Sequence, residues 1–271
     1  MKSAIFLLST ITLLLAMNTT SCAQNKITEW PPEFTEQWPA IEEYVEAAGV
    51  FTPPPSDAIV LFDGTNLDAW QQAPGYFPHM EGVPGYLNEL RAADGDAPWR
   101  VENGVMTVVP GSGNIMTRQH FGSVHLHLEW RTPEEISGEG QGRGNSGVFL
   151  MGLYEIQVLD SWQNPTYGNG QAGAIYKQKP PRVNASRPPG EWQSYDIFFE
   201  APYFDEEGQM IRPATITVLH NGILLHHRQE LQGPTTFIGP SFYHPHPDRL
   251  PLGLQDHGDL VSFRNIWVRE L

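Results

Sequence analysis

Short runs in which apolar and polar residues alternate dominate the chain from about residue 58 onward. In VHLHLEWR, residues 124–131, two Leu, a Val and a Trp alternate with two His, a Glu and an Arg. Because successive side chains of a strand point to opposite faces, this pattern predicts a strand with one face in a core. Comparable runs predict strands within residues 59–62, 99–109, 146–160, 191–204, 213–231 and 261–271.

Two Asn-Gly pairs, Asn103-Gly104 and Asn221-Gly222, interrupt these alternating runs. Asn-Gly between apolar alternations is the strongest short signal for a β-hairpin. Many short strands with almost no helical periodicity favour an antiparallel β-sandwich or jelly roll. The sequence therefore predicts an all-β domain over residues 57–271.

Residues 24–56 form an extension before this domain, bounded by prolines at Pro31-Pro32 and at 53–55. Its apolar residues fall on one helical stripe, which predicts a short amphipathic helix that packs on the domain as a strap; these are Phe34, Trp38, Ile41, Tyr44, Val45 and Ala48. Within the domain, residues 73–96 are rich in Gly and Pro and predict a long loop. Its Tyr76, Phe77, His79 and Tyr86 would either overhang a binding site or decorate the surface.

The first 23 residues have the pattern of an export signal, with Lys2 followed by an apolar run over about residues 4–16. That run is too short to span a bilayer as a stable helix. Cleavage after Ala23 and lipidation at Cys22, the only cysteine, are both consistent with the pattern. We therefore expect an exported protein that is periplasmic, secreted or an outer-membrane lipoprotein, without a disulfide in its mature form.

The overall charge argues against nucleic acid as a partner. Asp and Glu number 31 against 16 Lys and Arg, which gives a formal net charge of -15, and such a chain repels phosphate backbones. Abundant Gly, Pro and aromatic residues suit short strands, turns and surfaces that stack on sugars.

The run YEIQVLD, residues 154–160, carries the most informative polar pattern. Alternation places Glu155 and Gln157 on one face, and a β-bulge would bring Asp160 to the same side. Two carboxylates about 5 Å apart are the arrangement of a retaining glycosidase. The spacing resembles the ExDxxE signature of laminarinase-type endoglucanases, but Gln157 replaces the central Asp.

Other polar candidates lie in neighbouring runs. His127 and Glu129 share one strand face and would be either a solvated pair or an acid/base pair in a groove. Further candidates for binding or proton transfer follow in turns and loops: Arg143, Asn145, Lys177, Gln255 and His257. No HExxH motif or cysteine set is present, so the sequence predicts no cofactor, and a divalent metal held by residues that gather only in space stays open.

Six separated stretches occur in the order typical of one family: LFDGTNLDAW, WRVENGVMTVVPGSG, GQGRGNSGVFLMGLYEIQVLDSW, GAIYKQKPPRVNASRPPGEWQSYDIFFEAP, TVLHNG and LQDHGDLVSFRNIWVREL. Over about residues 58–271 the chain thereby resembles the 3-keto-disaccharide hydrolase domain family, formerly a domain of unknown function. The resemblance implies a concanavalin A-like β-sandwich with a concave substrate face, in exported bacterial proteins that process carbohydrates.

The chemistry that the resemblance implies is an elimination. A ketone at C3 of a glucoside acidifies the hydrogen at C2, so a base forms an enolate and the C1 oxygen substituent leaves; water then adds to the enone. Such a site needs a base, a group that stabilises the enolate and an acid. An oligosaccharide or glycoside would be the substrate, and an upstream 3-dehydrogenase would supply its ketone.

The hypothesis assigns these roles to the candidates above. Glu155 or His127 is the expected base, and Lys177, Arg143 and His257 are the expected polarising or acid groups. The expected sugar ligands are Glu129, Asn145, Gln157, Asp160 and Gln255. Two alternatives stay open: a retaining endoglucanase that uses Glu155 and Asp160, and a carbohydrate-binding lipoprotein without catalytic activity.

Overall fold

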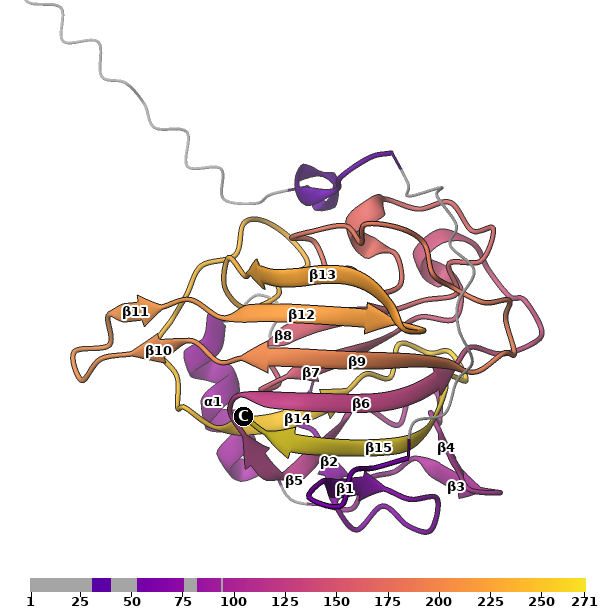
Figure 1. Cartoon of the computed structure of the whole chain (residues 1–271), viewed down its shortest axis with the longest axis horizontal. Helices are drawn as coiled ribbons and strands as arrows, with labels where there is room; N and C mark the ends of the chain where they lie inside the picture. The colour runs from indigo at the N-terminus through magenta and orange to yellow at the C-terminus, as the bar shows by residue number, and fades with distance from the viewer. Residues whose placement is uncertain (1–30, 40–52, 76–81, 94) are drawn as a thin grey trace, which may run out of the picture. The chain divides into compact units, whose positions relative to one another are not determined.

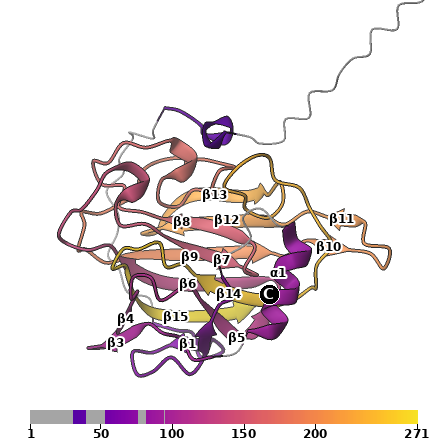
Figure 2. The same ribbon diagram turned by 180° about the vertical axis from the view of Figure 1, so that it is seen from behind.

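Two antiparallel β-sheets form the protein, and Figures 1 and 2 show them from opposite sides. The structure is a computed structural model that describes residues 31–39, 53–75, 82–93 and 95–271. The larger sheet has eight strands in the order β13 (Ile223–Glu230), β12 (Thr215–His220), β9 (Gln193–Glu200), β6 (Val124–Arg131), β15 (Ser262–Glu270), β4 (Val105–Thr107) and β3 (Arg100–Glu102), with β1 (Ile59–Phe62) also paired to β15. The predicted all-β sandwich is confirmed.

The second sheet has five strands and carries the run around Glu155. Its order is β2 (Trp70–Gln72), β5 (Ile115–Phe121), β14 (Leu250–Leu254), β7 (Ser146–Leu150) and β8 (Tyr154–Val158). A separate hairpin joins β10 (Tyr203–Phe204) to β11 (Met210–Arg212). The described helices are short: η1 (Pro32–Thr35), α1 (Gly82–Ala92), η2 (Gly140–Gly142) and η3 (Gly168–Gly170).

Both predicted Asn-Gly hairpins are present. Asn103 and Asn221 each have φ 53°, and the glycines that follow have φ 78° and 79°. Two successive residues with positive φ define the tight hairpin turn whose twist matches that of the flanking strands. These turns join β3 to β4 and β12 to β13.

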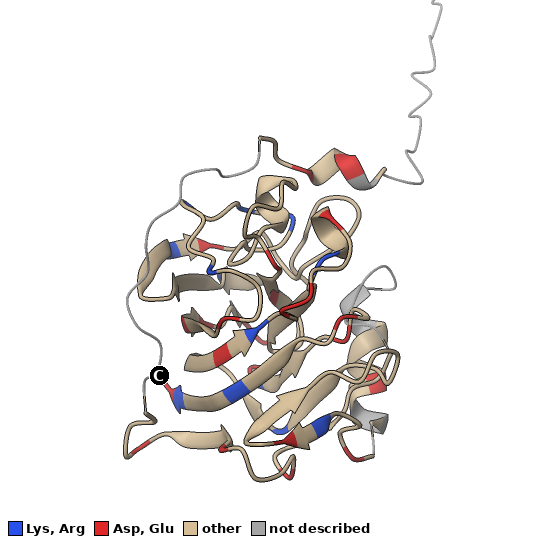
Figure 3. Ribbon diagram, turned by 90° about the vertical axis from the view of Figure 1, so that its right-hand side faces the viewer, with Lys and Arg blue, Asp and Glu red and all other residues tan. Residues whose placement is uncertain are grey.

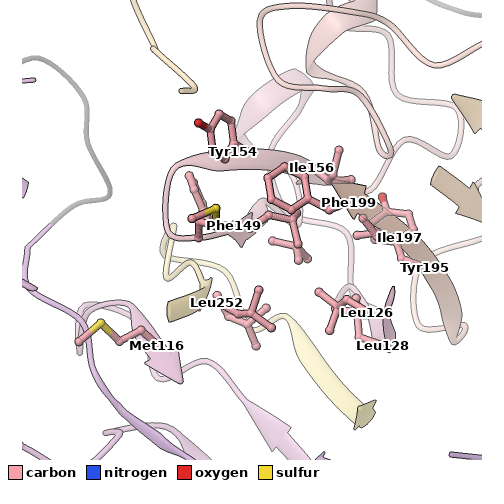
Figure 4. Packing of buried hydrophobic residues seen from close by; sticks show 14 of the residues in the cluster. Met116, Leu126, Leu128, Phe149, Tyr154, Ile156, Tyr195, Ile197, Phe199 and Leu252 are labelled. Carbon is pink, nitrogen blue, oxygen red and sulfur yellow. The ribbon is translucent and has the colours of Figure 1, made fainter. Parts of the chain in front are cut away.

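The core lies between the inner faces of the two sheets. Figure 4 shows Leu126 and Leu128 of β6 with Ile197 and Phe199 of β9, packed together with residues of the smaller sheet such as Ile156. Each of these side chains is at most 3% exposed. Removal of this apolar surface from water is the main stabilising contribution to such a sandwich.

The predicted long loop is wrong over its second half, where α1 forms. Tyr86 and Leu90, one helical turn apart, are 4% and 9% exposed and belong to the hydrophobic core. Burial also raises the pKa of the Tyr86 phenol well above its usual range. Side chains four residues apart share one helix face, so this pair marks the face of α1 that packs on the core, and Leu87 and Ala93 also pack against it. Tyr76, Phe77 and His79 lie outside the described residues.

Of the predicted N-terminal strap, the described part is η1 and the extended residues after it. The remaining stripe positions, 41–48, lie outside the described residues, as do the export signal and Cys22, so these stay predictions. Within the described ranges, no helix has the length and apolar character needed to cross a membrane. Figure 3 shows Asp and Glu interspersed with Lys and Arg on strands and loops, without a continuous basic strip in that view.

The neighbouring residues Phe198 and Phe199 of β9 give a matched test of the sheet faces. Phe199 is fully buried in the core, whereas Phe198 is 38% exposed on the other face, where it stacks on His125. We expect Phe199→Ala to lower the free energy of unfolding by about 3–5 kcal/mol, and Phe198→Ala by about 1 kcal/mol. Urea unfolding measures both; equal losses would contradict the assigned faces.

Candidate functional site

The candidate site lies on the face of β7 and β8 that points away from the sandwich core. The strands pair in continuous register, with Gly147 opposite Gln157 and Phe149 opposite Glu155. Directly opposed residues of an antiparallel pair point to the same face. Ile156 occupies the core face, so Glu155 and Gln157 share the outer face, as the alternation predicts.

A neighbouring strand extends this polar face. The backbone N–H of Gln255, directly after β14, donates to the carbonyl of Gly147 at 3.1 Å. Gln255, Gly147 and Gln157 therefore form one row across three chain segments. A Cβ at Gly147 would lie 2.6 Å from Oε1 of Glu155. Glycine at this position thus leaves the space that the carboxyl group occupies.

Glu155 is buried, and no residue that the structure describes compensates its charge. The residue is 5% exposed, and burial raises the pKa of its carboxyl to about 8. Among the residues that the structure describes, none makes a hydrogen bond or an ion pair with this carboxyl. Buried polar groups are nearly always hydrogen-bonded, and the exceptions concentrate where a ligand supplies the partner. Glu155 is therefore a strong proton acceptor once ionised.

Two tyrosines stand next to this carboxyl. The segment 173–176 runs along the open edge of β8, where Gln157 N–H donates to Ala174 O at 3.0 Å and Tyr176 N–H donates to Glu155 O at 3.2 Å. The hydroxyls of Tyr176 and Tyr167 are 2.9 Å apart. Burial raises the pKa of both phenols, and the charge of Glu155 raises it further. Both phenols consequently remain protonated and can donate.

Lys177 completes the group of titratable side chains. Its Nζ lies 4.1 Å from the ring centroid of Tyr167 and 3.3 Å from Oε1 of Glu36. Burial lowers the pKa of the ammonium, and the contact with Glu36 opposes that effect. Lys177 also has φ 60°, and its N–H donates to Asn169 O at 2.9 Å. Left-handed backbone at a residue other than glycine is strained and concentrates at functional sites.

Amide side chains form the remaining wall. Gln157 Nε2 donates to Asn145 Oδ1 and to Gln141 Oε1, both at 3.2 Å. Gln141 Nε2 in turn donates to Gly170 O at 2.8 Å. Amides both donate and accept, so a network of them next to a carboxyl suits the hydroxyl groups of a sugar.

Arg143 and Asp160 bind each other. Arg143 Nε donates to Asp160 Oδ2 at 2.7 Å, and Asp160 Oδ1 accepts from the N–H of Trp162 at 3.1 Å. Strand β8 ends at Val158 and its pairing with β7 contains no bulge, so the expected β-bulge before Asp160 is absent from that pairing. This buried pair holds the turn after β8, and its charges compensate each other.

His127 and Glu129, which the hypothesis places in one site with Glu155, lie on a different sheet, because β6 belongs to the eight-stranded sheet. His127 is fully buried there, with Nδ1 2.9 Å from Asp196 Oδ1. Glu129 accepts from Arg264 Nε at 2.6 Å. Alternation fixes the faces of one strand but not the sheet to which the strand belongs.

The loop after β14 separates two further candidates. Gln255 is 6% exposed and stands in the row described above, whereas His257 is exposed. The structure thus gathers Glu155, Gln157, Asn145, Gln255 and, through Tyr167, Lys177. The described residues contain no group of three or more His, Cys, Asp or Glu side chains placed to hold a metal ion.

Sequence reasoning missed Tyr167, Gln141 and Gly147 as parts of the site, whereas Tyr176 stands next to the candidate Lys177 in the run GAIYKQKPP and is a candidate with it. Tyr167 and Gln141 reach the site through irregular loops, whose path no periodicity predicts. Gly147 carries no side chain, and its importance depends on a contact across two strands.

The fold is an antiparallel β-sandwich, and its smaller sheet carries the carboxyl of Glu155 together with amides and phenols. Comparison with known proteins gives the family. The model of the 3-keto-alpha-glucoside-1,2-lyase-like domain matches residues 57–269, and the chain belongs to this family.

Individual relatives agree with this membership. A 3-keto-disaccharide hydrolase from Bacteroides thetaiotaomicron is 24% identical over 257 residues, which cover 79% of this chain and 78% of that protein. A crystal structure of a candidate glycosyl hydrolase from Parabacteroides distasonis is similar with TM-score 0.71 and 44% identity, covering 86% of this chain and 92% of that one. A second structure described in the same words, from the same species, shares the fold at 19% identity, with TM-score 0.53, covering 79% and 94% of the two chains.

Burial of Glu155 makes stability depend on pH. Its pKa in the folded chain, about 8, lies above its ordinary value of 4.5, so the folded chain retains the proton to a higher pH than the unfolded chain. The stability that the proton on Glu155 contributes is fully present below about pH 4.5 and is lost as the pH rises through about 8. We expect the melting temperature of Glu155→Gln to exceed that of the wild type increasingly between pH 5 and pH 9.

Differential scanning fluorimetry across this pH range measures the effect. Glu270→Gln is the control, because Glu270 is exposed and its ion pair with Arg249 lowers its pKa. This control should show no increase with pH relative to the wild type. A constant difference between Glu155→Gln and the wild type from pH 5 to pH 9 would contradict the raised pKa.

Proposed function

We propose that this protein cleaves the glycosidic bond of 3-keto-glycosides, with Glu155 as the base that removes the proton at C2. The observation that carries the proposal is the buried carboxyl of Glu155, which lacks a partner among the described residues and has a pKa of about 8. A base whose pKa lies close to the working pH combines an adequate ionised fraction with a high proton affinity. Family membership supports the choice of substrate class.

The reaction divides into two steps whose atoms balance. Ionised Glu155 takes the proton from C2, and the electrons of the C–H bond form an enolate with the C3 ketone. The enolate then collapses to a C1–C2 double bond as the C1–O bond breaks, and the leaving oxygen takes up a proton. Addition of water across this double bond yields the free 3-keto sugar, so the net reaction is hydrolysis.

Lys177 and the tyrosine pair supply the other two groups that this chemistry needs. A buried ammonium stabilises a developing enolate oxygen more strongly than an exposed one, because little water screens it. Lys177 has this character, with a side chain 2% exposed. The phenols of Tyr167 and Tyr176 remain protonated, and we assign the proton for the leaving oxygen to this pair.

The amides around Glu155 are assigned to sugar binding. Gln157 shares the strand face of Glu155, Asn145 bonds to Gln157, and Gln255 stands next to Gly147. None of these amides carries a charge of its own. A neutral Gln157 fits a base-catalysed elimination, which requires one ionised carboxylate rather than the two of a retaining glycosidase. The contact of Asp160 with Arg143 also argues against Asp160 as the second carboxylate.

The proposed substrate implies a preceding reaction. A ketone at C3 arises by oxidation of a secondary hydroxyl group of the glycoside, so a 3-dehydrogenase would act upstream. The predicted export signal would place the cleavage outside the cytoplasm.

The proposal is tested with a 3-keto-glucoside and the matching unoxidised glucoside. We expect turnover of the oxidised substrate alone, detected as released aglycone by chromatography and as an enone by ultraviolet absorbance. Cleavage of unoxidised β-glucan would instead indicate an ordinary glycosidase, and binding without turnover would indicate a carbohydrate-binding protein. Either result overturns the proposal.

The role of Glu155 is tested by substitution and by pH. Glu155→Gln should lower kcat/KM by about 100-fold to 10,000-fold, the usual contribution of a general base. In the wild type, kcat/KM should rise with pH through about 8, because only the ionised carboxylate accepts the proton. Glu270→Gln, on the surface, should keep the wild-type kcat/KM.

His127 is the other candidate base that the sequence suggests, and its substitution tests that alternative. It lies on the eight-stranded sheet, so His127→Gln should leave kcat/KM within a few-fold of the wild type when the variant is folded. A profile without a rise near pH 8, or a folded His127→Gln that is as inactive as Glu155→Gln, would contradict the assignment of the base.

A further inference from the structure

A short segment before the matched family domain is bound directly to the candidate site. Asn169, fully buried in η3, makes two hydrogen bonds with this segment. Its Nδ2 donates to Thr35 O at 2.7 Å, and its Oδ1 accepts from Gln37 N–H at 3.0 Å. Gly168 N–H also donates to Gln37 O at 2.7 Å. One side-chain amide thus binds the backbone on both sides of Glu36.

The loop is shaped to receive this segment. A Cβ at Gly168 would lie 3.2 Å from Gln37 O and 3.1 Å from Pro39 O. The side chain of Gln37 adds a hydrogen bond from Nε2 to Gln178 O at 3.0 Å. Residues 35–37 are therefore bound to Gly168 and Asn169, which precede Lys177 in the sequence, and to Gln178, which follows it.

This docking brings Glu36 to Lys177. Oε1 of Glu36 lies 3.3 Å from Nζ of Lys177, while Oε2 accepts from Trp38 Nε1 at 3.2 Å. The side chains of Glu36 and Lys177 are 17% and 2% exposed, so water screens the pair weakly. A hollow of about 240 Å³ adjoins the pair, bordered by both residues together with Thr35, Gln37, Gln178 and Ser241.

We propose that Glu36, which lies outside the matched domain of residues 57–269, is a positioning residue that fixes the Lys177 ammonium against the ring of Tyr167. Lys177 has a long side chain with many rotamers, and an ion pair at its tip selects one of them. The catalytic meaning of this contact rests on the proposed function; the contact itself does not.

The charge of Glu36 also keeps Lys177 protonated. Burial lowers the pKa of the ammonium, and Glu36 is the largest opposing influence, with a smaller one from Glu33. The phenol of Tyr167 lies against Lys177 and bonds to the phenol of Tyr176, whose pKa the charge of Glu155 also raises. Without Glu36, the largest influence that opposes burial is removed, so the ammonium would lose its proton at a lower pH.

The test is a titration of Lys177 by NMR in the full chain labelled at lysine. The sequence has four lysines, Lys2, Lys26, Lys177 and Lys179, so few signals need assignment. We expect Glu36→Gln to move the titration midpoint of Lys177 down by about 1 to 2 pH units, the usual effect of one close opposite charge. Lys179 is the internal reference.

Two further variants distinguish the effect of the direct contact between Glu36 and Lys177 from the effect of a more distant negative charge. Glu36→Asp keeps the charge but shortens the side chain, and should lower the midpoint less than Glu36→Gln; it also serves if Glu36→Gln does not fold. Glu33→Gln removes a charge from the same segment. The structure shows no hydrogen bond or ion pair between Glu33 and Lys177 among the described residues, so this variant should move the Lys177 midpoint least. An unchanged midpoint in a folded Glu36→Gln, or equal shifts from positions 33 and 36, would overturn the proposal.

An activity measurement distinguishes this inference from the proposed function. In Glu36→Gln, kcat for a 3-keto-glucoside should fall by about tenfold or more, with its alkaline limb moved to lower pH and KM less affected. If the wild type turns over the substrate through Glu155 but the titration midpoint of Lys177 does not move in Glu36→Gln, only the role of Glu36 is refuted. Absence of turnover in the wild type would refute the proposed function, and the titration would still decide the contact.

Discussion

The site depends on one property of β7 and β8, which is that both faces of these strands are buried under other parts of the protein. Every residue of these two strands is buried, although only one of their faces packs against the opposite sheet. Loops and α1 add a further layer outside the five-stranded sheet, so polar groups on its outer face are withdrawn from water. Such groups must find partners or remain costly. Gln157 and Asn145 do find them, whereas none of the described residues bonds to the carboxyl of Glu155.

Irregular backbone can form this layer because its polar groups are satisfied locally. The segment 173–176 bonds to the edge of β8, and Tyr195 from the eight-stranded sheet donates through its hydroxyl to Gln157 O at 2.7 Å. Asn164 and Asn169 bond to the backbone of neighbouring turns. A loop held in this way can place phenols and an ammonium as firmly as a strand would.

The sequence predicts the strands and their faces well, because alternation follows directly from backbone geometry. It therefore identified Glu155 and Gln157 on one face, and both Asn-Gly turns. It could not predict which strands share a sheet, so His127 stood beside Glu155 as an alternative base for one site. It also could not predict contacts that loops make, so Tyr167 and Glu36 were recognised only in space. The helix α1 was missed because its few core-contacting residues, Tyr86, Leu87 and Leu90, stand within a Gly- and Pro-rich segment.

The space above Gly147 has a consequence for the movements of the surrounding loop. The carboxyl of Glu155 is withheld from water only while β14, β7 and the loop that carries Tyr167 and Tyr176 are all in place. If that loop opened, water would reach the carboxyl and its pKa would return toward 4.5, so at neutral pH the opening would release a proton. Opening is thereby linked to proton release and becomes more favourable as the pH rises. The solution around the protein then influences how readily a sugar can enter or leave, through a carboxyl that the same sugar is proposed to meet.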